Sequence, residues 1–245
     1  MNYLDLEHYY DRIKKLPLKE SYEKAEILTA DFFIENQGSM EIYYCAHNEY
    51  VNTKAKIFII GITPGFQQMS KSIAVARKAI ERSIPLEEVP YICKSEGRFY
   101  GVIRKNIIDM LNELELNKVL EIESCSELFG SKDYLLHTTS VIPFAVFVDG
   151  KNYTGHRPKL LKNDLLLKYV KNYFYPQVNA LKHGLFIPLG KSVEEVLEDL
   201  IKSGVLKEEQ CLKGFPHPSG ANGHRFTQFE QNKEKMKKII KNYLQ

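Results

Sequence analysis

Two short loops of this sequence hold polar side chains in turns built from Pro and Gly. Residues 61–65 read Gly-Ile-Thr-Pro-Gly and follow the apolar run 57–60, and residues 217–220 read His-Pro-Ser-Gly and close the run 212–215. Pro restricts the backbone φ angle, and Gly allows φ values that other residues avoid. Such residues are needed where the chain must pass close to a ligand. The chemistry available is that of an imidazole, which exchanges a proton near neutral pH, and of hydroxyl groups, which can orient a water molecule.

The remaining sequence predicts elements that would bring these loops together. Apolar runs and helical periodicity indicate strands at 56–62, 135–144 and 185–190, a last strand ending at the second loop, and helices at 4–16, 22–35, 68–82, 99–114, 158–173, 193–201 and 227–244. Strands that alternate with helices favour a three-layer α/β/α sandwich with a mainly parallel central sheet. Loops at the carboxyl ends of such strands meet at one crevice, so we expect both loops to form one site.

We interpret residues 51–245 as one domain, on which a helical N-terminal extension of residues 1–50 packs. The formal net charge of +3 is too small to indicate a nucleic-acid partner by itself. No apolar stretch reaches membrane-spanning length, and the first residues do not resemble a secretion signal. We therefore expect a cytoplasmic protein with no membrane partner.

The four cysteines occur singly, at Cys45, Cys93, Cys125 and Cys211. Their spacing is not that of a zinc or iron–sulfur site, and scattered cysteines are typical of a reducing compartment. We expect a monomer that needs no metal and no cofactor.

Four segments, in order, resemble motifs of the uracil-DNA glycosylase superfamily. Residues 61–65 resemble the first motif of the mismatch-specific and single-strand-selective branches, usually G-[IM]-N-P-G, and residues 217–219 match the second motif, H-P-S. Residues 98–100 (Arg-Phe-Tyr) resemble an R-F-W segment, and residues 187–190 (Ile-Pro-Leu-Gly) resemble the V-A-L-G strand that precedes the second motif. The resemblance runs from about residue 56 to the carboxyl terminus.

The resemblance implies a fold of that superfamily and an enzyme that flips a damaged or deaminated base out of DNA and hydrolyses its N-glycosidic bond. It assigns the attacking water to Thr63 and the donor to the departing base to His217. The implied base pocket comprises Gly61, Ile62, Pro64, Gly65, Phe66, Phe99, Tyr100, Ser140 and Asn152. The implied DNA contacts are Pro218, Ser219, Gly220, Asn222, His224 and Arg225, with Arg225 as the first candidate for a wedge that enters the duplex.

Two positions depart from the family pattern. Thr63 stands where the family has Asn or Asp, and a hydroxyl can orient a water molecule but cannot act as a general base at neutral pH. Ser140 stands where an Asn would read the base at a strand end. Asn152 is a substitute candidate for reading the base, and Asp149 is a substitute candidate for orienting the water.

Two other classes of function therefore stay open. The first is a nucleic-acid-binding protein of the same fold without glycosylase activity, which Thr63 and Ser140 motivate. The second is an enzyme that processes a nucleotide or nucleoside in the same crevice. The protein can be tested for binding to single- or double-stranded DNA that contains a lesion. Affinity that falls steeply with salt would favour the glycosylase or the nucleic-acid-binding protein over the enzyme that processes a nucleotide or nucleoside.

Overall fold

The parallel sheet of the protein has three strands. The structure, a computed structural model, describes residues 4–244, and β3 (Ile57–Gly61) lies between β4 (Leu136–Ser140) and β7 (Leu185–Pro188). Both neighbours run parallel to β3, every residue of which is buried. A parallel strand covered on both faces is expected to be apolar throughout. The mixed α/β fold expected from the sequence is confirmed.

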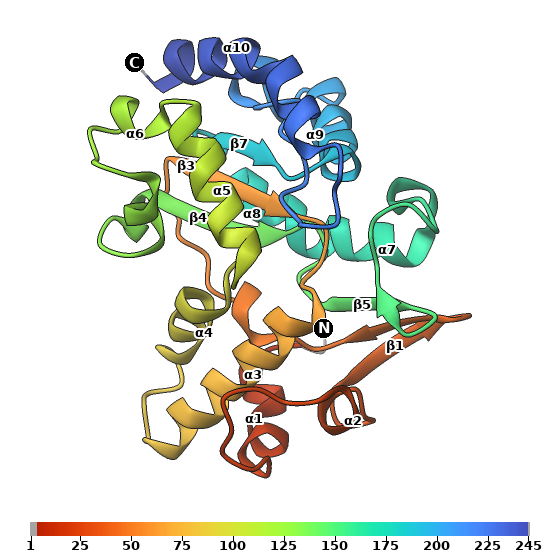
Figure 1. Cartoon of the computed structure of the whole chain (residues 1–245). Coiled ribbons are helices and arrows are strands. Elements are labelled where there is room, and N and C mark those ends of the chain that lie inside the picture. Colours follow the sequence, from red (N-terminus) through yellow and green to blue (C-terminus); the bar gives the residue numbers. More distant parts are fainter. Residues whose placement is uncertain (1–3, 245) are drawn as a thin grey trace.

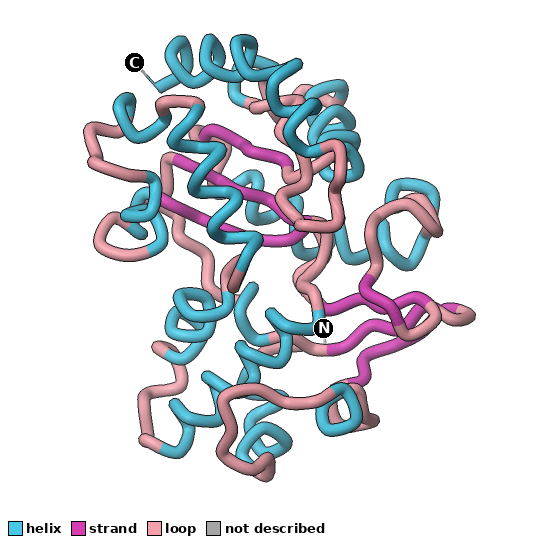
Figure 2. Tube along the Cα trace, viewed as in Figure 1, coloured by secondary structure: helices cyan, strands magenta, loops and turns pink. Residues whose placement is uncertain are grey.

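A second sheet of four antiparallel strands lies apart from the first (Figure 2). Its order is β1 (Phe33–Gln37), β2 (Met40–Tyr43), β5 (Ala145–Val148) and β6 (Lys151–Asn152). The prediction of a mainly parallel sheet therefore applies to one of the two sheets. The β1–β2 hairpin turns at Gly38, whose φ of 61° costs glycine no strain.

This second sheet corrects two local predictions. The helix expected over 22–35 is limited to α2 (Lys24–Ile27), so residues 1–50 are not a wholly helical extension. The strand expected over 135–144 ends with β4 at Ser140, residues 141–144 form a bend instead of a strand, and the chain then enters the second sheet with β5 at Ala145. Pairing between β2 and β5 joins segments about 100 residues apart, and local periodicity carries no information about such pairing.

Helices cover both sheets and connect them (Figure 1). Their bounds are α1 Leu6–Lys14, α3 Phe66–Glu81, α4 Val89–Gly97, α5 Val102–Glu113, α6 Leu116–Val119, α7 Asp164–Tyr169, α8 Tyr175–Ala180, α9 Lys191–Lys202 and α10 Arg225–Leu244. A π-helical turn, Val170–Phe174, joins α7 to α8. Helix α4 escaped prediction because Pro90 reads as a break, although Pro is tolerated in the first turn of a helix. Within residues 4–244, no helix is both long and apolar enough to cross a membrane.

The side chains of β3 alternate between two hydrophobic cores. Ile57 and Ile59 pack with residues of α5 and α10, whereas Phe58 and Ile60 pack with residues of α3 and α9. The rings of Phe58 and Phe186 lie 4.9 Å apart between centroids. Fully burying one such side chain contributes about 1.5–3 kcal/mol, so the loop that follows β3 starts from a firmly held strand.

The last predicted strand, over residues 212–215, is not a strand in the structure. Cys211 forms a single parallel bridge with Phe186, and the N–H of Leu212 donates to the Phe186 carbonyl oxygen over 2.8 Å. Gly214 then turns the chain at a φ of 89°. The ladder therefore stops after one pair, which still brings the 217–220 loop beside the carboxyl end of β7.

Candidate functional site

A cavity of about 860 Å³ opens at the carboxyl ends of β3 and β7. We call it the main cavity. Its wall includes these residues named from the sequence: Gly61, Ile62, Thr63, Gly65, Phe99, Asn152, His217, Ser219 and Asn222. The two Pro- and Gly-containing loops thus share one site, where open parallel sheets commonly bind ligands.

A glycine holds the second loop against the end of β7. Gly190 has a φ of 88°, and a Cβ atom built on it would lie 3.0 Å from Cβ of His217. Its N–H donates to the carbonyl oxygen of Phe215 over 3.0 Å. Any other residue would be strained by its backbone conformation and by this contact, so Gly190 sets how closely His217 approaches the sheet.

His217 has its tautomer set by its own loop. The N–H of Ser219 donates to Nδ1 of His217 over 3.3 Å, which puts the proton of the neutral ring on Nε2. Burial lowers the pKa of His217 below its ordinary value of 6.5, because an imidazolium is poorly solvated there. At neutral pH the ring is therefore an uncharged hydrogen-bond donor.

The first loop becomes the N-terminus of α3, where side chains from two elements satisfy its backbone. The N–H of Gly65 donates to Oε1 of Gln68 over 3.1 Å, and the N–H of Phe66 donates to Oδ1 of Asn152 over 3.0 Å. Asn152 belongs to β6, so this bond joins the antiparallel sheet to the site. Its Nδ2 has no hydrogen-bond partner among residues 4–244 and is available as a donor at the cavity wall.

Glu194 supplies a carboxylate to the cavity wall. Its Oε2 accepts from the N–H of Gly214 over 2.6 Å, and its Oε1 pairs with Nζ of Lys191 at 2.9 Å. Asp149 lies instead in the exposed turn after β5, outside this wall. In the part of the chain that the structure describes, no three His, Cys, Asp or Glu side chains gather closely enough to hold a metal ion.

Several residues named from the sequence lie outside the wall of the main cavity: Pro64, Phe66, Tyr100, Ser140, Pro218, Gly220, His224 and Arg225. Helix α3 turns the ring of Phe66 toward that of Phe147, 6.5 Å away between centroids. Tyr100 is 51% exposed. Arg225 donates from Nη1 to the carbonyl oxygen of Ser219 over 3.1 Å, so it braces the second loop.

Other residues of the wall escaped the sequence analysis, among them Gln68, Ile103, Tyr153, Thr154, His156, Lys191, Ser192, Glu194, Gln228 and Asn232. The sequence Gly-Lys-Ser directly after a buried strand, at the start of α9, could have indicated part of this wall, because helix N-termini favour anions. The 153–156 loop carried no such signal. It reaches the cavity because Gly155, at a φ of 86°, packs directly on Ser192.

A second, smaller cavity adjoins the first, and we call it the inner cavity. It is too narrow for a water molecule, and its wall comprises His47, Asn48, Gln68, Arg98, Phe99, Thr138, Thr139 and Ser140. Phe99 and Gln68 line both cavities. Beside it, Nζ of the buried Lys94 donates to the Thr138 carbonyl oxygen over 2.5 Å and to Oδ1 of Asn48 over 3.2 Å. Burial lowers the pKa of Lys94 to about 7.

Comparison with known proteins identifies a relative that matches nearly the whole chain. The chain is 39% identical to the uncharacterized protein YoxB of Bacillus subtilis (strain 168) over 239 residues, which are 97% of this chain and 93% of that protein. The chain belongs to the YoxB family. Because the match spans 97% of the chain, the YoxB family shares the sequence of both sheets and not of the parallel sheet alone. No protein-family model and no solved structure matches the chain.

Proposed function

We propose that the main cavity receives a damaged or deaminated base flipped out of DNA, and that the protein hydrolyses the N-glycosidic bond of this base. The observation that carries the proposal is the meeting of His217 and Thr63 in one cavity. An enzyme that acts on a base must take it out of the stack into a pocket. A cavity of about 860 Å³ is within the size range of small-molecule sites and has room for a nucleoside.

In this mechanism negative charge develops on the departing base. His217, neutral with its proton on Nε2, donates to that charge without first gaining a proton, and a donor fixed in advance stabilises the transition state. The Thr63 hydroxyl orients the attacking water. Nδ2 of Asn152 donates to an acceptor atom of the base. Each role uses a group that lines the cavity.

The phosphates beside the flipped nucleotide would contact two loops. Ser219 lies in the second loop, and Lys191 and Ser192 open α9, whose N-cap Gly190 offers no side chain to its backbone N–H groups. Free N–H groups and the helix dipole at this end favour an anion. These contacts position the DNA and carry no sequence information.

We assign the wedge to Phe226, which is 72% exposed in the first turn of α10, next to the residue that braces the second loop. Apolar side chains of this kind enter between base steps and unstack them. Phe226→Ala should lower the rate of base release from duplex DNA by about 10-fold, the order of one lost stacking contact. The same variant should release base from single strands at the wild-type rate. An equal loss on both substrates would assign Phe226 to a different role.

One observation favours a nucleic-acid-binding protein without glycosylase activity. Both oxygens of Glu194, the carboxylate in the wall, are already engaged by Gly214 and Lys191, and Thr63 lacks the basicity to replace it. Binding of DNA without release of any base would establish this alternative.

The test is a panel of oligonucleotides carrying uracil, hypoxanthine, oxidised pyrimidines and G·T or G·U mismatches, with abasic product measured under single-turnover conditions. His217→Ala should lower the rate by at least about 100-fold, the order found for removing one preorganised donor. His183→Ala is the control, because His183 is also a histidine but is exposed and lies outside the cavity wall. Thr63→Asn should raise activity on uracil. No product on any substrate, with DNA still bound, would overturn the glycosylase proposal.

A further inference from the structure

Hydrolysis in the main cavity needs a group that takes a proton from the attacking water. A positioned base contributes about 10²–10⁴-fold to such a step, and the Thr63 hydroxyl is too weakly basic to supply it. Among residues 4–244, the titratable side chains that line the main cavity are those of Tyr153, His156, Lys191, Glu194 and His217. Their contacts decide which of them can accept a proton.

Three of these side chains are engaged by their neighbours. The hydroxyl of Tyr153 donates to the Pro158 carbonyl oxygen over 2.5 Å, and burial raises its pKa, so it keeps its proton. A hydrogen bond to Glu194 raises the pKa of Lys191, which therefore stays an ammonium group. Each oxygen of Glu194 already accepts a hydrogen bond, from the Gly214 N–H over 2.6 Å and from Nζ of Lys191 over 2.9 Å.

The two histidines of the wall differ in their contacts. Nδ1 of His217 accepts from the Ser219 N–H over 3.3 Å, and the proton on its Nε2 is used at the departing base. The ring of His156 is exposed in the wall and has no hydrogen-bond partner among the described residues. A neutral imidazole has one nitrogen without a proton, which can accept one. His156 therefore has the free basic nitrogen that the other four side chains lack.

A glycine places His156 beside the first loop. Gly155 has a φ of 86°, and a Cβ atom built on it would lie 3.3 Å from Cδ1 of Ile62 and 2.6 Å from Oγ of Ser192. Ile62 directly precedes Thr63, and Gly155 directly precedes His156. The segment that carries His156 is therefore packed against both the first loop and α9, and His156 and Thr63 each lie one residue from this contact.

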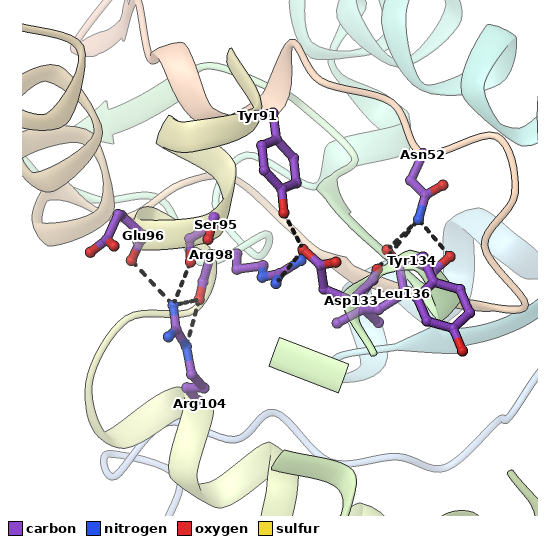
Figure 3. A network of polar contacts seen from close by, with 9 residues as sticks. All are labelled: Asn52, Tyr91, Ser95, Glu96, Arg98, Arg104, Asp133, Tyr134 and Leu136. Atoms are coloured by element: carbon purple, nitrogen blue, oxygen red, sulfur yellow. Dashed lines mark hydrogen bonds and ion pairs between the residues drawn. The ribbon is translucent and has the colours of Figure 1, made fainter. Parts of the chain in front are cut away.

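Phe99 presents an apolar ring to the first loop. Its Cε1 would lie 3.5 Å from a Cβ atom built on Gly61. Figure 3 shows the network that holds the preceding residue: Nη2 of Arg98 donates to Oδ2 of Asp133 over 3.2 Å, and Nη2 of Arg104 donates to the Arg98 carbonyl oxygen over 2.7 Å. The Asp133 carboxylate is thus paired and lies outside the cavity wall, so it is not a second candidate for the base.

We propose that His156 is the general base of the hydrolysis, a role that rests on the proposed function. The water oriented by Thr63 gives a proton to the free ring nitrogen of His156 as its oxygen bonds to C1′ of the sugar. The bond from C1′ to the base breaks, and its electron pair leaves with the base, which accepts the hydrogen bond from Nε2 of His217. The departed base takes up a proton from solvent and His156 releases its own, which leaves a hydroxyl on C1′ and the free base.

The test measures base release under single-turnover conditions from the oligonucleotide of the panel that the wild type cleaves fastest. His156→Ala should lower the rate by at least about 100-fold, the lower end for the loss of a general base. His156→Gln should lose as much, because an amide can hydrogen-bond to water but cannot take its proton. Added imidazole should restore part of the rate of His156→Ala. Pyrazole, a ring of the same size and a much weaker base, should not.

His183→Ala is the control, because His183 is exposed and lies outside the cavity wall, so this variant should keep the wild-type rate with and without imidazole. The proposal is overturned if His156→Ala or His156→Gln keeps the wild-type rate, or if imidazole and pyrazole act alike on His156→Ala. Those outcomes leave the glycosylase function standing. Absence of base release by the wild type from every oligonucleotide would overturn the glycosylase function, and the role of His156 with it.

Discussion

At the scale of single residues, burial decides which charges the site carries. His217 and Lys94 both have lowered pKa values because their charged forms are poorly solvated. For His217 the result is a neutral donor at physiological pH. For Lys94, beside the inner cavity, the result is an amine that loses its proton near neutral pH.

The burial of Lys94 can be tested by measuring the free energy of unfolding at several pH values. Its pKa is lowered from 10.5 to about 7, so between these values the unfolded state binds more protons than the folded state, and stability rises with pH. Lys94→Met should remove a slope of up to about 1.4 kcal/mol per pH unit from the free energy of unfolding between pH 7 and 9. Urea unfolding at several pH values measures it. Lys105→Met, at a 75% exposed side chain, should keep the wild-type slope.

At the scale of elements, the site is built where rigid strands end in turns that only particular residues allow. β3 and β7 are buried over their full lengths, and the loops after them are positioned by close backbone contacts. Gly190 is one of these positions, because His217 packs directly over it.

Gly190→Ala should destabilise the protein by about 1–3 kcal/mol, since a residue at this φ is strained and its Cβ would press on His217. Gly220→Ala, in the loop that carries His217, should change stability by less than about 0.5 kcal/mol, because no atom lies within 4 Å of the added Cβ. The free energy of unfolding in urea distinguishes them. Equal effects would show that the contact with His217 is not tight.

At the scale of the whole molecule, the site depends on both sheets. Thr63 lies in the loop after β3, and His217 packs beside the end of β7, so both are positioned by the parallel sheet. Asn152 belongs to β6 of the antiparallel sheet. The bond from the Phe66 N–H to Asn152 is a link between the sheets at the cavity, and the packing of Gly155 on Ser192 is another.

Asn152→Ala should lower the free energy of unfolding by about 1 kcal/mol, the value of a typical helix cap, and should speed hydrogen exchange in the first turn of α3. Lys151→Ala is the control, because Lys151 lies on the same strand, exposed, and makes no side-chain hydrogen bond with the described residues. Unchanged exchange in α3 after Asn152→Ala would show that the sheets are held together elsewhere.

By itself, the sequence determined the features that depend on local composition. Continuous apolar runs identify β3 and β7, helical periodicity identifies α3, α5, α9 and α10, and the Pro- and Gly-containing turns identify Thr63 and His217 as cavity residues. Only the tertiary structure decided the second sheet, the role of Asn152 as a cap, and the inner cavity behind Phe99. These features arise from hydrogen bonds and packing between residues far apart in the chain, such as the pairing of β2 with β5. No local pattern encodes which distant partner a strand edge or a buried hydroxyl will meet.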